Sequence, residues 1–224
     1  MGKNICFYGN LQSVGIDVTR PSLVNIGDNV EIVAPFDLIT HGFEWSVFRE
    51  KYREIIGSSG KVTIGNNVYI GADVTILKGS TIGNNVVIGA KSLINKDIPS
   101  DCVAAGVPAK KLMGLDEYFE KRKKEYVTEA KEYALSIYKV FERLPVEEDF
   151  IEFFPLFLKR DEQSIDIFNI KLKSKTKRDK RSTMSVQSQL GSAFKKFLQS
   201  QPQYTSFEDF LADAGIPSEQ IKSK

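Results

Sequence analysis

The sequence has few of the residues on which many functional sites depend. Its 224 residues include two cysteines, Cys6 and Cys102, and a single histidine, His41. Two cysteines this far apart form neither a disulfide framework nor a metal-binding spacing. A single histidine also excludes sites that need several imidazole ligands from one chain. We therefore expect a reduced protein without a metal site.

Long apolar runs and an excess of one charge are also absent. No apolar run approaches the roughly 20 residues needed to span a membrane. The first ten residues, MGKNICFYGN, lack the charged segment and apolar run of a signal peptide. The 31 basic side chains nearly balance 29 acidic ones, for a net charge of +2, so no bulk positive field favours nucleic acid. We expect a cytoplasmic protein with no integral membrane segment and no nucleic-acid partner.

What the chain does have is a six-residue period in its middle. Isoleucine recurs at perfect spacing, and a small or β-branched residue stands two positions before each isoleucine. These isoleucines are Ile64, Ile70, Ile76, Ile82, Ile88 and Ile94. Because residues two apart point to the same face of a strand, each hexad directs a pair of side chains inward and then turns. A period of six is too short for a helical solenoid and is typical of a parallel β-helix.

The repeat extends beyond this clean core. Upstream, the same pairing holds for Val24/Ile26, Val30/Ile32 and Phe36/Leu38, and Val14 and Val18 also fit. The hexads stop between Leu38 and Val62, so residues 42–60 are expected to form a loop ejected from the β-helix. The repeat ends at Ile98-Pro99, and residues 105–109 are expected to form an extended exit strand.

The period becomes helical from Asp116. Apolar residues recur at spacings of seven, four, three, four and four from Phe119 to Phe141, which predicts a long amphipathic helix. A second apolar cluster covers 150–158, and a basic, Ser/Thr-rich stretch over 171–185 predicts a linker. Two further helices are expected near 189–200 and 206–214, the second with Ser206 as its N-cap.

These patterns predict a mainly β fold with two parts. Residues 1–112 are expected to form the β-helix, and residues 113–224 a helical C-terminal extension. The apolar stripe of the long helix requires a packing partner, so we expect it to pack on the β-helix or on a neighbouring subunit. The basic linker could attract an anionic polysaccharide or membrane surface, but its composition favours a solvated linker.

The stretch Ile64–Leu112 resembles the hexapeptide-repeat acyltransferases. It is most similar to the galactoside and maltose acetyltransferases and to the streptogramin and chloramphenicol group. The resemblance, which covers residues 8–112, implies a left-handed β-helix with three hexads per coil, acetyl-CoA as cosubstrate, and a homotrimer with active sites between subunits. The left hand comes from the resemblance alone, because general crossover chirality favours the right hand.

The resemblance places the catalytic histidine where a loop leaves the β-helix, and His41 stands at that position. An imidazole can accept the proton of an attacking hydroxyl near neutral pH. His41 is therefore expected to be the general base of a direct acetyl transfer, with no covalent intermediate. The simpler alternative is an ordinary surface or core histidine.

The resemblance also implies a binding site for acetyl-CoA. Ala72 and Ala90 would contact the pantetheine arm through their backbones, and the Ala72 amide would face the thioester oxygen. Tyr69 would flank the arm or the acceptor. Lys110 stands where relatives often carry arginine for the phosphates, and a lysine there loses bidentate geometry. The residues expected to bind acetyl-CoA are Tyr69, Ala72, Ala90, Asn95, Lys96 and Lys110.

On the acceptor side, Phe7-Tyr8-Gly9-Asn10 resembles the Phe-Tyr-Ala-Asn of the galactoside enzymes, whose asparagine contacts sugar and the catalytic histidine. Asp17 lies one residue away from the position of a substrate-binding aspartate, and a turn-capping role is the alternative. Trp45 would form an apolar lid or sugar platform, or pack against another subunit. We expect Asn10, Asp17 and Trp45 to bind a sugar or polysaccharide acceptor.

Other functions remain open at this point. The same scaffold could acetylate the amine of an amino sugar or the hydroxyl of an antibiotic. It could also be a non-catalytic assembly protein, which would not bind coenzyme A. A γ-class carbonic anhydrase is excluded, because that enzyme needs three histidine ligands for zinc and this chain has one histidine.

Overall fold

The protein consists of two compact units. The computed structural model describes residues 1–176 and 185–217. Its two units are Met1–Lys121 and Arg122–Lys224, so the division falls nine residues after the expected boundary at Leu112.

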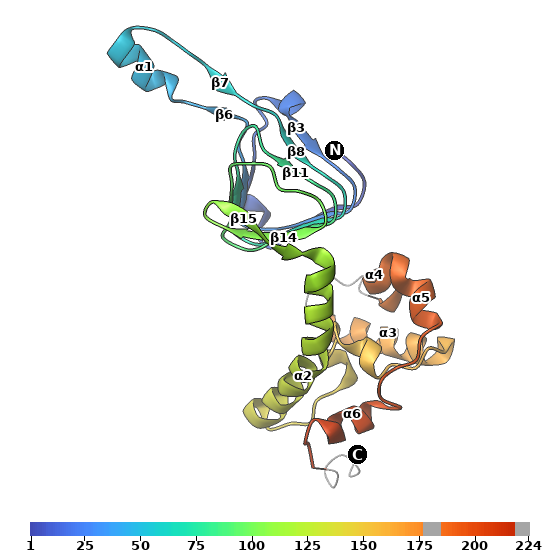
Figure 1. Cartoon of the computed structure of the whole chain (residues 1–224). Helices are drawn as coiled ribbons and strands as arrows, with labels where there is room; N and C mark the ends of the chain where they lie inside the picture. Colours follow the sequence, from blue (N-terminus) through green and yellow to red (C-terminus); the bar gives the residue numbers. More distant parts are fainter. Residues whose placement is uncertain (177–184, 218–224) are drawn as a thin grey trace. The chain divides into compact units, whose positions relative to one another are not determined.

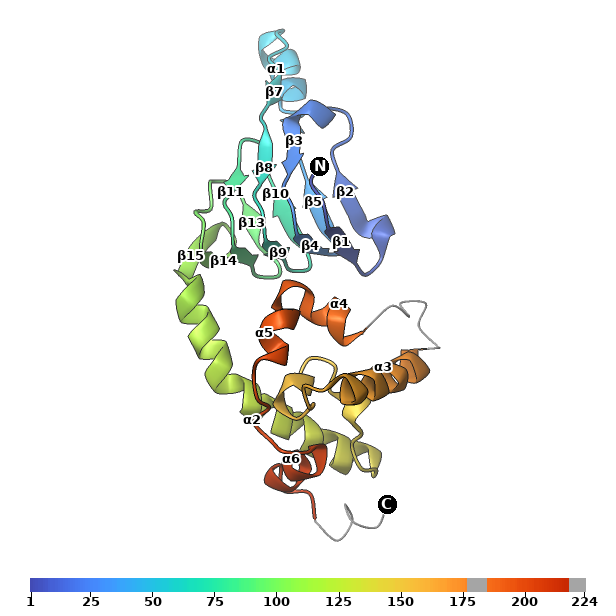
Figure 2. The same ribbon diagram turned by 90° about the vertical axis from the view of Figure 1, so that its right-hand side faces the viewer.

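The first unit is a parallel β-helix of three sheets, whose triangular cross-section is visible in Figure 1 and whose stacked strands are visible in Figure 2. Sheet A contains β1 (Ile5–Tyr8), β4 (Val30–Val33), β9 (Val68–Ile70), β12 (Val86–Ile88) and β14 (Cys102–Gly106). Sheet B contains β2 (Val14–Ile16), β5 (Phe36–Leu38), β10 (Val74–Ile76) and β13 (Leu93–Ile94). Sheet C contains β3 (Val24–Ile26), β8 (Val62–Ile64) and β11 (Thr81–Ile82).

Each coil visits the three sheets in turn, as β9, β10 and β11 do. Val68 pairs in parallel register with Val86, which is three hexads later. All six isoleucines of the repeat point inward and are at most 1% exposed. The predicted six-residue period is therefore confirmed, and burying each isoleucine contributes about 1.5–3 kcal/mol.

The turns between sheets C and A explain the Gly-Asn-Asn sequences that follow several isoleucines. A Cβ on Gly65 would lie 2.5 Å from the carbonyl oxygen of Gly83 in the next coil, so this close approach requires glycine. Asn67 and Asn85 adopt positive φ angles of 55° and 56°, which asparagine tolerates better than most residues. Asn67 Nδ2 donates to the side-chain oxygen Oδ1 of Asn85 at 2.9 Å, and this hydrogen bond links neighbouring coils.

Two details of the repeat differ from expectation. Val18 is 80% exposed, because the inward pair of β2 is Val14 and Ile16, in register with Phe36 and Leu38. The exit of the β-helix is a hairpin rather than a single extended strand. The chain reverses at Gly106, where φ is +108°, and β15 (Ala109–Gly114) returns antiparallel to β14.

Residues 42–60, which we call the arm, leave the β-helix between β5 and β8 as expected. The arm is more ordered than a plain loop. It begins in β6 (His41–Gly42), contains α1 (Trp45–Tyr52), and returns through β7 (Ser58–Ser59), which pairs antiparallel with β6. Figure 1 shows it projecting from one corner of the triangle.

The second unit is helical. Helix α2 (Leu115–Phe141) begins in the first unit and continues into the second. It confirms the long helix that the sequence predicts from Asp116. The other helices are α3 (Glu162–Thr176), α4 (Val186–Leu190), α5 (Phe194–Leu198) and α6 (Phe207–Asp213), with short 3-10 helices at η3 (Glu147–Asp149), η4 (Phe154–Leu156) and η5 (Gly191–Ala193). Ser206 caps α6 as predicted, accepting a hydrogen bond from the Asp209 amide at 3.1 Å.

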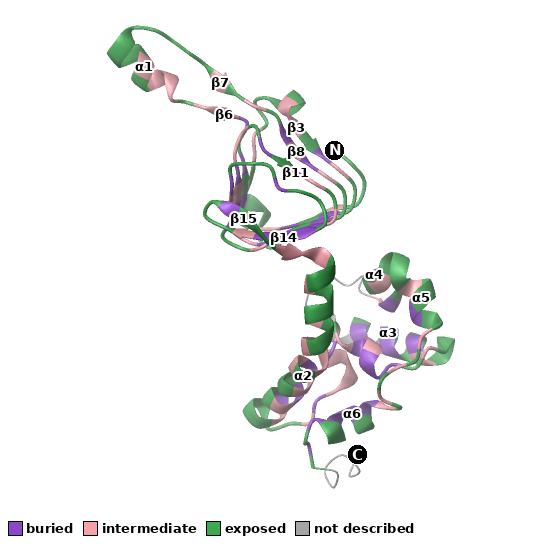
Figure 3. Ribbon diagram, in the orientation of Figure 1, coloured by how far each residue is buried: buried purple, intermediate pink, exposed green. Residues whose placement is uncertain are grey.

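This unit has a hydrophobic core of its own, visible as the buried inner faces of its helices in Figure 3. Phe150, Phe168 and Phe210 are fully buried in it, together with Ala134 and Ile137 of α2. Part of the apolar stripe of α2 is thus covered within the unit, whereas Tyr133 and Phe141 are 43% and 66% exposed. The expected packing of the helix on the β-helix or on a neighbouring subunit stays a prediction.

The linker expected over 171–185 is wrong in its first part, because residues 171–176 belong to α3. Helix α3 buries three apolar residues at helical spacing, Ile165, Phe168 and Leu172. The basic residues on either side of Leu172 gave this segment the composition of a linker. Residues 177–184 of the expected linker lie outside the described residues. Within the described part of the chain, no helix is long and apolar enough to cross a membrane.

Candidate active site

The β-helix brings segments that follow the sheet B strands to one corner. Residue Asp17 follows β2, and His41 follows β5. Ile16 is in register with Leu38, and the Asp17 amide donates to the Leu38 carbonyl at 3.0 Å. Stacking of these two coils therefore places Asp17 beside His41 although 24 residues separate them.

The two side chains are in direct contact. His41 Nδ1 lies 2.5 Å from Asp17 Oδ2, and the side chains are 20% and 7% exposed, respectively. An ionised carboxylate can only accept hydrogen bonds, so Nδ1 carries the proton in this contact. The imidazole is thereby held in one orientation and one tautomer, with Nε2 as its basic nitrogen.

Two threonines donate hydrogen bonds to the Asp17 carboxylate. Thr19 donates its hydroxyl and its amide to Asp17 Oδ1 at 2.6 and 3.0 Å, and the hydroxyl and amide of buried Thr40 donate to Oδ2. These hydrogen bonds, led by that from the Thr19 hydroxyl and followed by those from Thr40 and His41, hold the pKa of Asp17 well below its usual range. Asp17 is therefore a carboxylate at neutral pH. The sequence interpretation assigned Asp17 to the acceptor, whereas the structure places it against the imidazole.

A row of aromatic rings begins at His41 and runs along the arm. The ring centroids of His41 and Phe43 are 5.5 Å apart, and those of Phe43 and Trp45 are 5.6 Å apart. Phe43 is 66% exposed, while the guanidinium of Arg49 lies 5.5 Å from the Trp45 ring centroid. Phe43 thus lies between Trp45 and His41. The sequence interpretation did not identify Phe43 as a site residue.

Most residues expected to bind acetyl-CoA do not lie at the corner of the β-helix that carries His41. Ala72 and Ala90 lie at the corner between sheets A and B, in adjacent coils, where the Ala72 carbonyl accepts from the Lys91 amide at 2.8 Å. Tyr69 is 42% exposed in β9, on the outer face of sheet A. Lys110 is exposed in the terminal hairpin, paired with Ala105.

Asn95 and Lys96 do share the corner of His41, since they follow β13 just as His41 follows β5, and both are exposed. Asn10 does not share it. It follows β1 at the corner between sheets A and B, where its side-chain oxygen caps the 3-10 helix η1 (Leu11–Ser13) by accepting from the Gln12 amide at 3.1 Å. Within one chain, the strands of sheet B separate Asn10, Ala72 and Ala90 from His41.

Residues that sequence reasoning missed include Thr19, Thr40, Phe43, Glu44 and Lys78. Stacking positions could have indicated some of them, because Thr40 and Lys78 follow β5 and β10 at the same corner. Thr19 and Glu44 lie in the irregular coil and in the arm, where no period gives their position.

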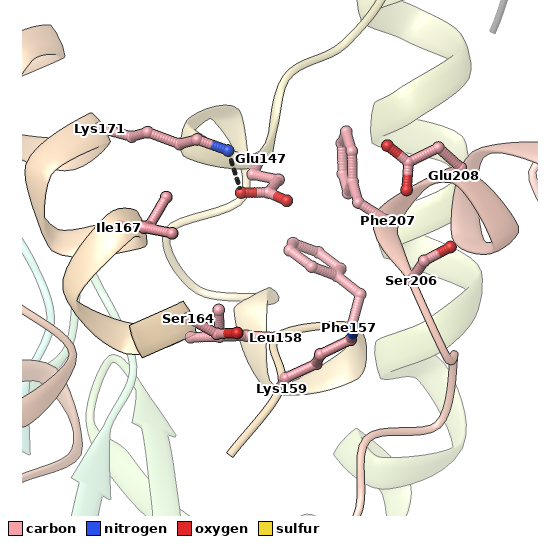
Figure 4. A pocket seen from close by; sticks show the side chains of 10 residues that line it. All are labelled: Glu147, Phe157, Leu158, Lys159, Ser164, Ile167, Lys171, Ser206, Phe207 and Glu208. Atoms are coloured by element: carbon pink, nitrogen blue, oxygen red, sulfur yellow. Dashed lines mark hydrogen bonds and ion pairs between the residues drawn. The ribbon is translucent and has the colours of Figure 1, made fainter. Parts of the chain in front are cut away.

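An open hollow of about 250 Å³ lies in the helical unit, among residues 147–208. Two of its four charged lining residues, Lys171 and Glu147, pair with each other at 2.6 Å, as Figure 4 shows. The lining residues are Glu147, Phe157, Leu158, Lys159, Ser164, Ile167, Lys171, Ser206, Phe207 and Glu208. In the described part of the chain, no group of three or more His, Cys, Asp or Glu residues is arranged to hold a metal ion.

Comparison with known proteins identifies the repeat. The family model described as "Bacterial transferase hexapeptide (six repeats)" matches residues 61–96, which include β8 to β13. Protein CapG of Staphylococcus aureus is 41% identical over 129 residues, which cover 54% of this chain and 74% of CapG. Galactoside O-acetyltransferase of Escherichia coli (strain K12) is 40% identical over 117 residues, 52% of this chain and 54% of that enzyme.

Among solved structures, a maltose O-acetyltransferase from Clostridium difficile 630 is 34% identical, covering 51% of this chain and 57% of that one, with a TM-score of 0.43. The chain spans about half the length of the relatives named as O-acetyltransferases but three quarters of CapG. The chain therefore belongs to the bacterial hexapeptide-repeat transferases, and it is an acyltransferase of that family.

Proposed function

We propose that the protein is an acetyl-CoA-dependent O-acetyltransferase that acts on a hydroxyl of a sugar or polysaccharide unit. The observation that carries the proposal is the contact of 2.5 Å between His41 and Asp17. An imidazole whose Nδ1 proton is held by a carboxylate is a well-oriented general base. Similarity to a protein named galactoside O-acetyltransferase supports a sugar hydroxyl as the acceptor.

In the proposed reaction, His41 Nε2 removes the proton of the acceptor hydroxyl as its oxygen attacks the thioester carbonyl. The new C–O bond gives a tetrahedral intermediate, whose negative oxygen is stabilised by the backbone N–H of Ala72 from the neighbouring subunit of the proposed assembly. When the C–S bond breaks, His41 returns the proton to the departing sulfur. Asp17 stays ionised throughout and stabilises the protonated imidazole.

The corner between sheets A and B fits the pantetheine arm of acetyl-CoA. A Cβ on Gly71 would lie 2.6 Å from the Ala90 nitrogen, so adjacent coils approach closely. The small side chains of Ala72 and Ala90 lie on this edge and leave the backbone open to a ligand. Exposed Lys96 and Lys110 supply positive charge for phosphate groups.

The proposed assembly is a homotrimer of left-handed β-helices with active sites between subunits. Its support is the separation of His41 and Asp17 from Ala72, Ala90 and Asn10, which lie at different corners of one prism. A second copy can supply the missing corner. Exposed apolar residues of the arm, such as Phe43 at 66% and Ile55 at 69% exposure, also require cover. Light scattering should show a trimer, and a stable monomer at micromolar concentration would contradict the assembly.

The experiment that tests the function is an acceptor panel. The protein is mixed with acetyl-CoA and a galactoside, maltose, glucosamine or chloramphenicol, and released thiol is measured. We expect turnover with a sugar hydroxyl, an O-acetyl product by mass spectrometry, and loss of turnover in His41→Ala. Acetylation of the glucosamine amine or of chloramphenicol would instead favour those alternatives. Absence of coenzyme A binding by calorimetry would favour a non-catalytic protein.

A further inference from the structure

The root of the arm is fastened to the β-helix by one lysine. Lys78 follows β10 at the corner of His41, and its Nζ donates to Glu44 Oε1 at 2.7 Å. The same Nζ also donates to Ser58 Oγ. Glu44 precedes α1 on the outgoing side of the arm, and Ser58 belongs to β7 on the returning side. A single ammonium group therefore ties both sides of the arm to the third coil.

Backbone contacts around Lys78 complete this fastening. The Gly60 amide donates to the Thr40 carbonyl at 2.9 Å, and the Gly79 amide donates to the Lys61 carbonyl at 3.1 Å. A Cβ on Gly60 would lie 2.8 Å from the Gly79 nitrogen, so the turn after Lys78 packs directly on the arm root. The position of the arm root is thus set by the coil that carries Lys78.

Away from its root, the arm is exposed. Helix α1 contains no buried residue, and the hairpin of β6 and β7 has two residues in each strand. A hairpin this short is not stable alone. Contacts at the root must therefore define where β6 lies.

His41 is itself the first residue of β6, and it pairs with Ser59 beside Ser58. The imidazole is fixed on one side by Asp17. On the other side its backbone pairs with β7, whose Ser58 is held by the Lys78 ammonium and by a hydrogen bond from Arg20 Nη1 to its carbonyl oxygen at 3.4 Å. Displacement of the arm root would move His41 relative to Asp17 and to the reacting atoms.

We propose that Lys78 is a positioning residue for His41: by clamping Glu44 and Ser58 it holds β6 so that the imidazole keeps its contact with Asp17. The proposal rests on the proposed role of His41 as general base. The rival role for Lys78 is direct binding of an anionic group of a substrate. Its ammonium is already paired with the Glu44 carboxylate, which favours positioning.

The test uses Lys78→Met, which keeps most of the length of the side chain and removes its charge. Activity is measured with acetyl-CoA and p-nitrophenyl β-galactoside as the acceptor probe. Because a misplacement of about 1 Å can cost about 100-fold in rate, we expect kcat to fall by about 10- to 100-fold, with KM for both substrates changed by less than about threefold. Lys78→Arg should restore most of kcat. Lys61→Met removes an exposed charge at the same corner and is the matched control, with unchanged kinetics.

A second readout does not depend on the acceptor. His41 is the only histidine in the chain, so the imidazole nitrogen resonances of the folded protein report on it alone. We expect Lys78→Met and Glu44→Gln to shift or broaden these resonances and Lys61→Met to leave them unchanged. Circular dichroism confirms that each variant is folded.

Unchanged His41 resonances in both Lys78→Met and Glu44→Gln would overturn the positioning role. So would a raised KM with unchanged kcat, because that result indicates substrate binding by Lys78. Retained turnover in His41→Ala would overturn the proposed function of His41 instead, and the resonances would still decide whether Lys78 holds the ring.

Discussion

Replacing Asp17 with asparagine tests the central contact of the site. The substitution keeps the shape of the side chain and removes its charge. Asp17 accepts hydrogen bonds from Thr19 at Oδ1 and from Thr40 and His41 at Oδ2. An asparagine offers one oxygen and one NH₂ group, so its NH₂ must face groups that now donate to the carboxylate.

Either orientation of this asparagine is unfavourable for catalysis. With the NH₂ toward His41, Nδ1 can no longer donate, and the imidazole is driven to the tautomer whose Nε2 carries a proton and cannot act as a base. With the NH₂ toward Thr19, the hydroxyl and amide of Thr19 lose their acceptor. Loss of the correct tautomer costs up to about 10⁴-fold in a serine protease with the same Asp–His arrangement. We expect kcat of Asp17→Asn to fall by about 10²–10⁴-fold.

The measurement is kcat by thiol release with saturating acetyl-CoA and acceptor, together with calorimetric titration of coenzyme A. Binding of coenzyme A should be nearly unchanged, because Asp17 faces the imidazole. Thr19→Ser is the matched control, since it keeps a hydroxyl donor for Asp17 and should retain most activity. A kcat for Asp17→Asn within about threefold of the original protein would refute the reasoning, because the carboxylate would then have no part in orienting the base.

Three further outcomes follow from the structure. His41→Ala should lower kcat by about 10²–10⁴-fold and leave coenzyme A binding intact by calorimetry; unchanged turnover would remove His41 from the mechanism. The hydrogen bond from Lys78 lowers the pKa of Glu44 to about 2 from its ordinary 4.5, so the stabilisation of the arm is complete above about pH 4.5 and is lost as pH falls toward 2. Limited proteolysis of the arm with pepsin should accelerate over that interval more steeply than in Glu44→Gln, which already lacks the ion pair and reports the pH dependence of pepsin itself; identical profiles would contradict this. Phe150→Ala, at a fully buried position in the helical core, should destabilise the helical unit by about 3–5 kcal/mol; denaturant unfolding followed by far-UV circular dichroism measures this, and a loss below 1 kcal/mol would contradict the packing described.

The helical extension shows where sequence patterns were sufficient and where they were misleading. Helix α2 and the Ser206 cap of α6 were predicted correctly, because helical periodicity and capping are local properties. The start of the expected linker was wrong, because basic residues on the exposed side of α3 have the composition of a linker. Its buried positions, Ile165, Phe168 and Leu172, were present in the sequence at helical spacing but are few.

By itself, the sequence determined the β-helix, because every hexad carries its own strand, its own inward pair and its own turn. The same regularity identified His41 as the residue at which the arm departs. Only the tertiary structure decided what surrounds His41. Asp17 belongs to a coil in which Arg20 and Pro21 interrupt the period, and Lys78 reaches Glu44 across 34 residues of sequence. These contacts depend on which coils stack and on how the arm folds back, and a one-dimensional period contains neither.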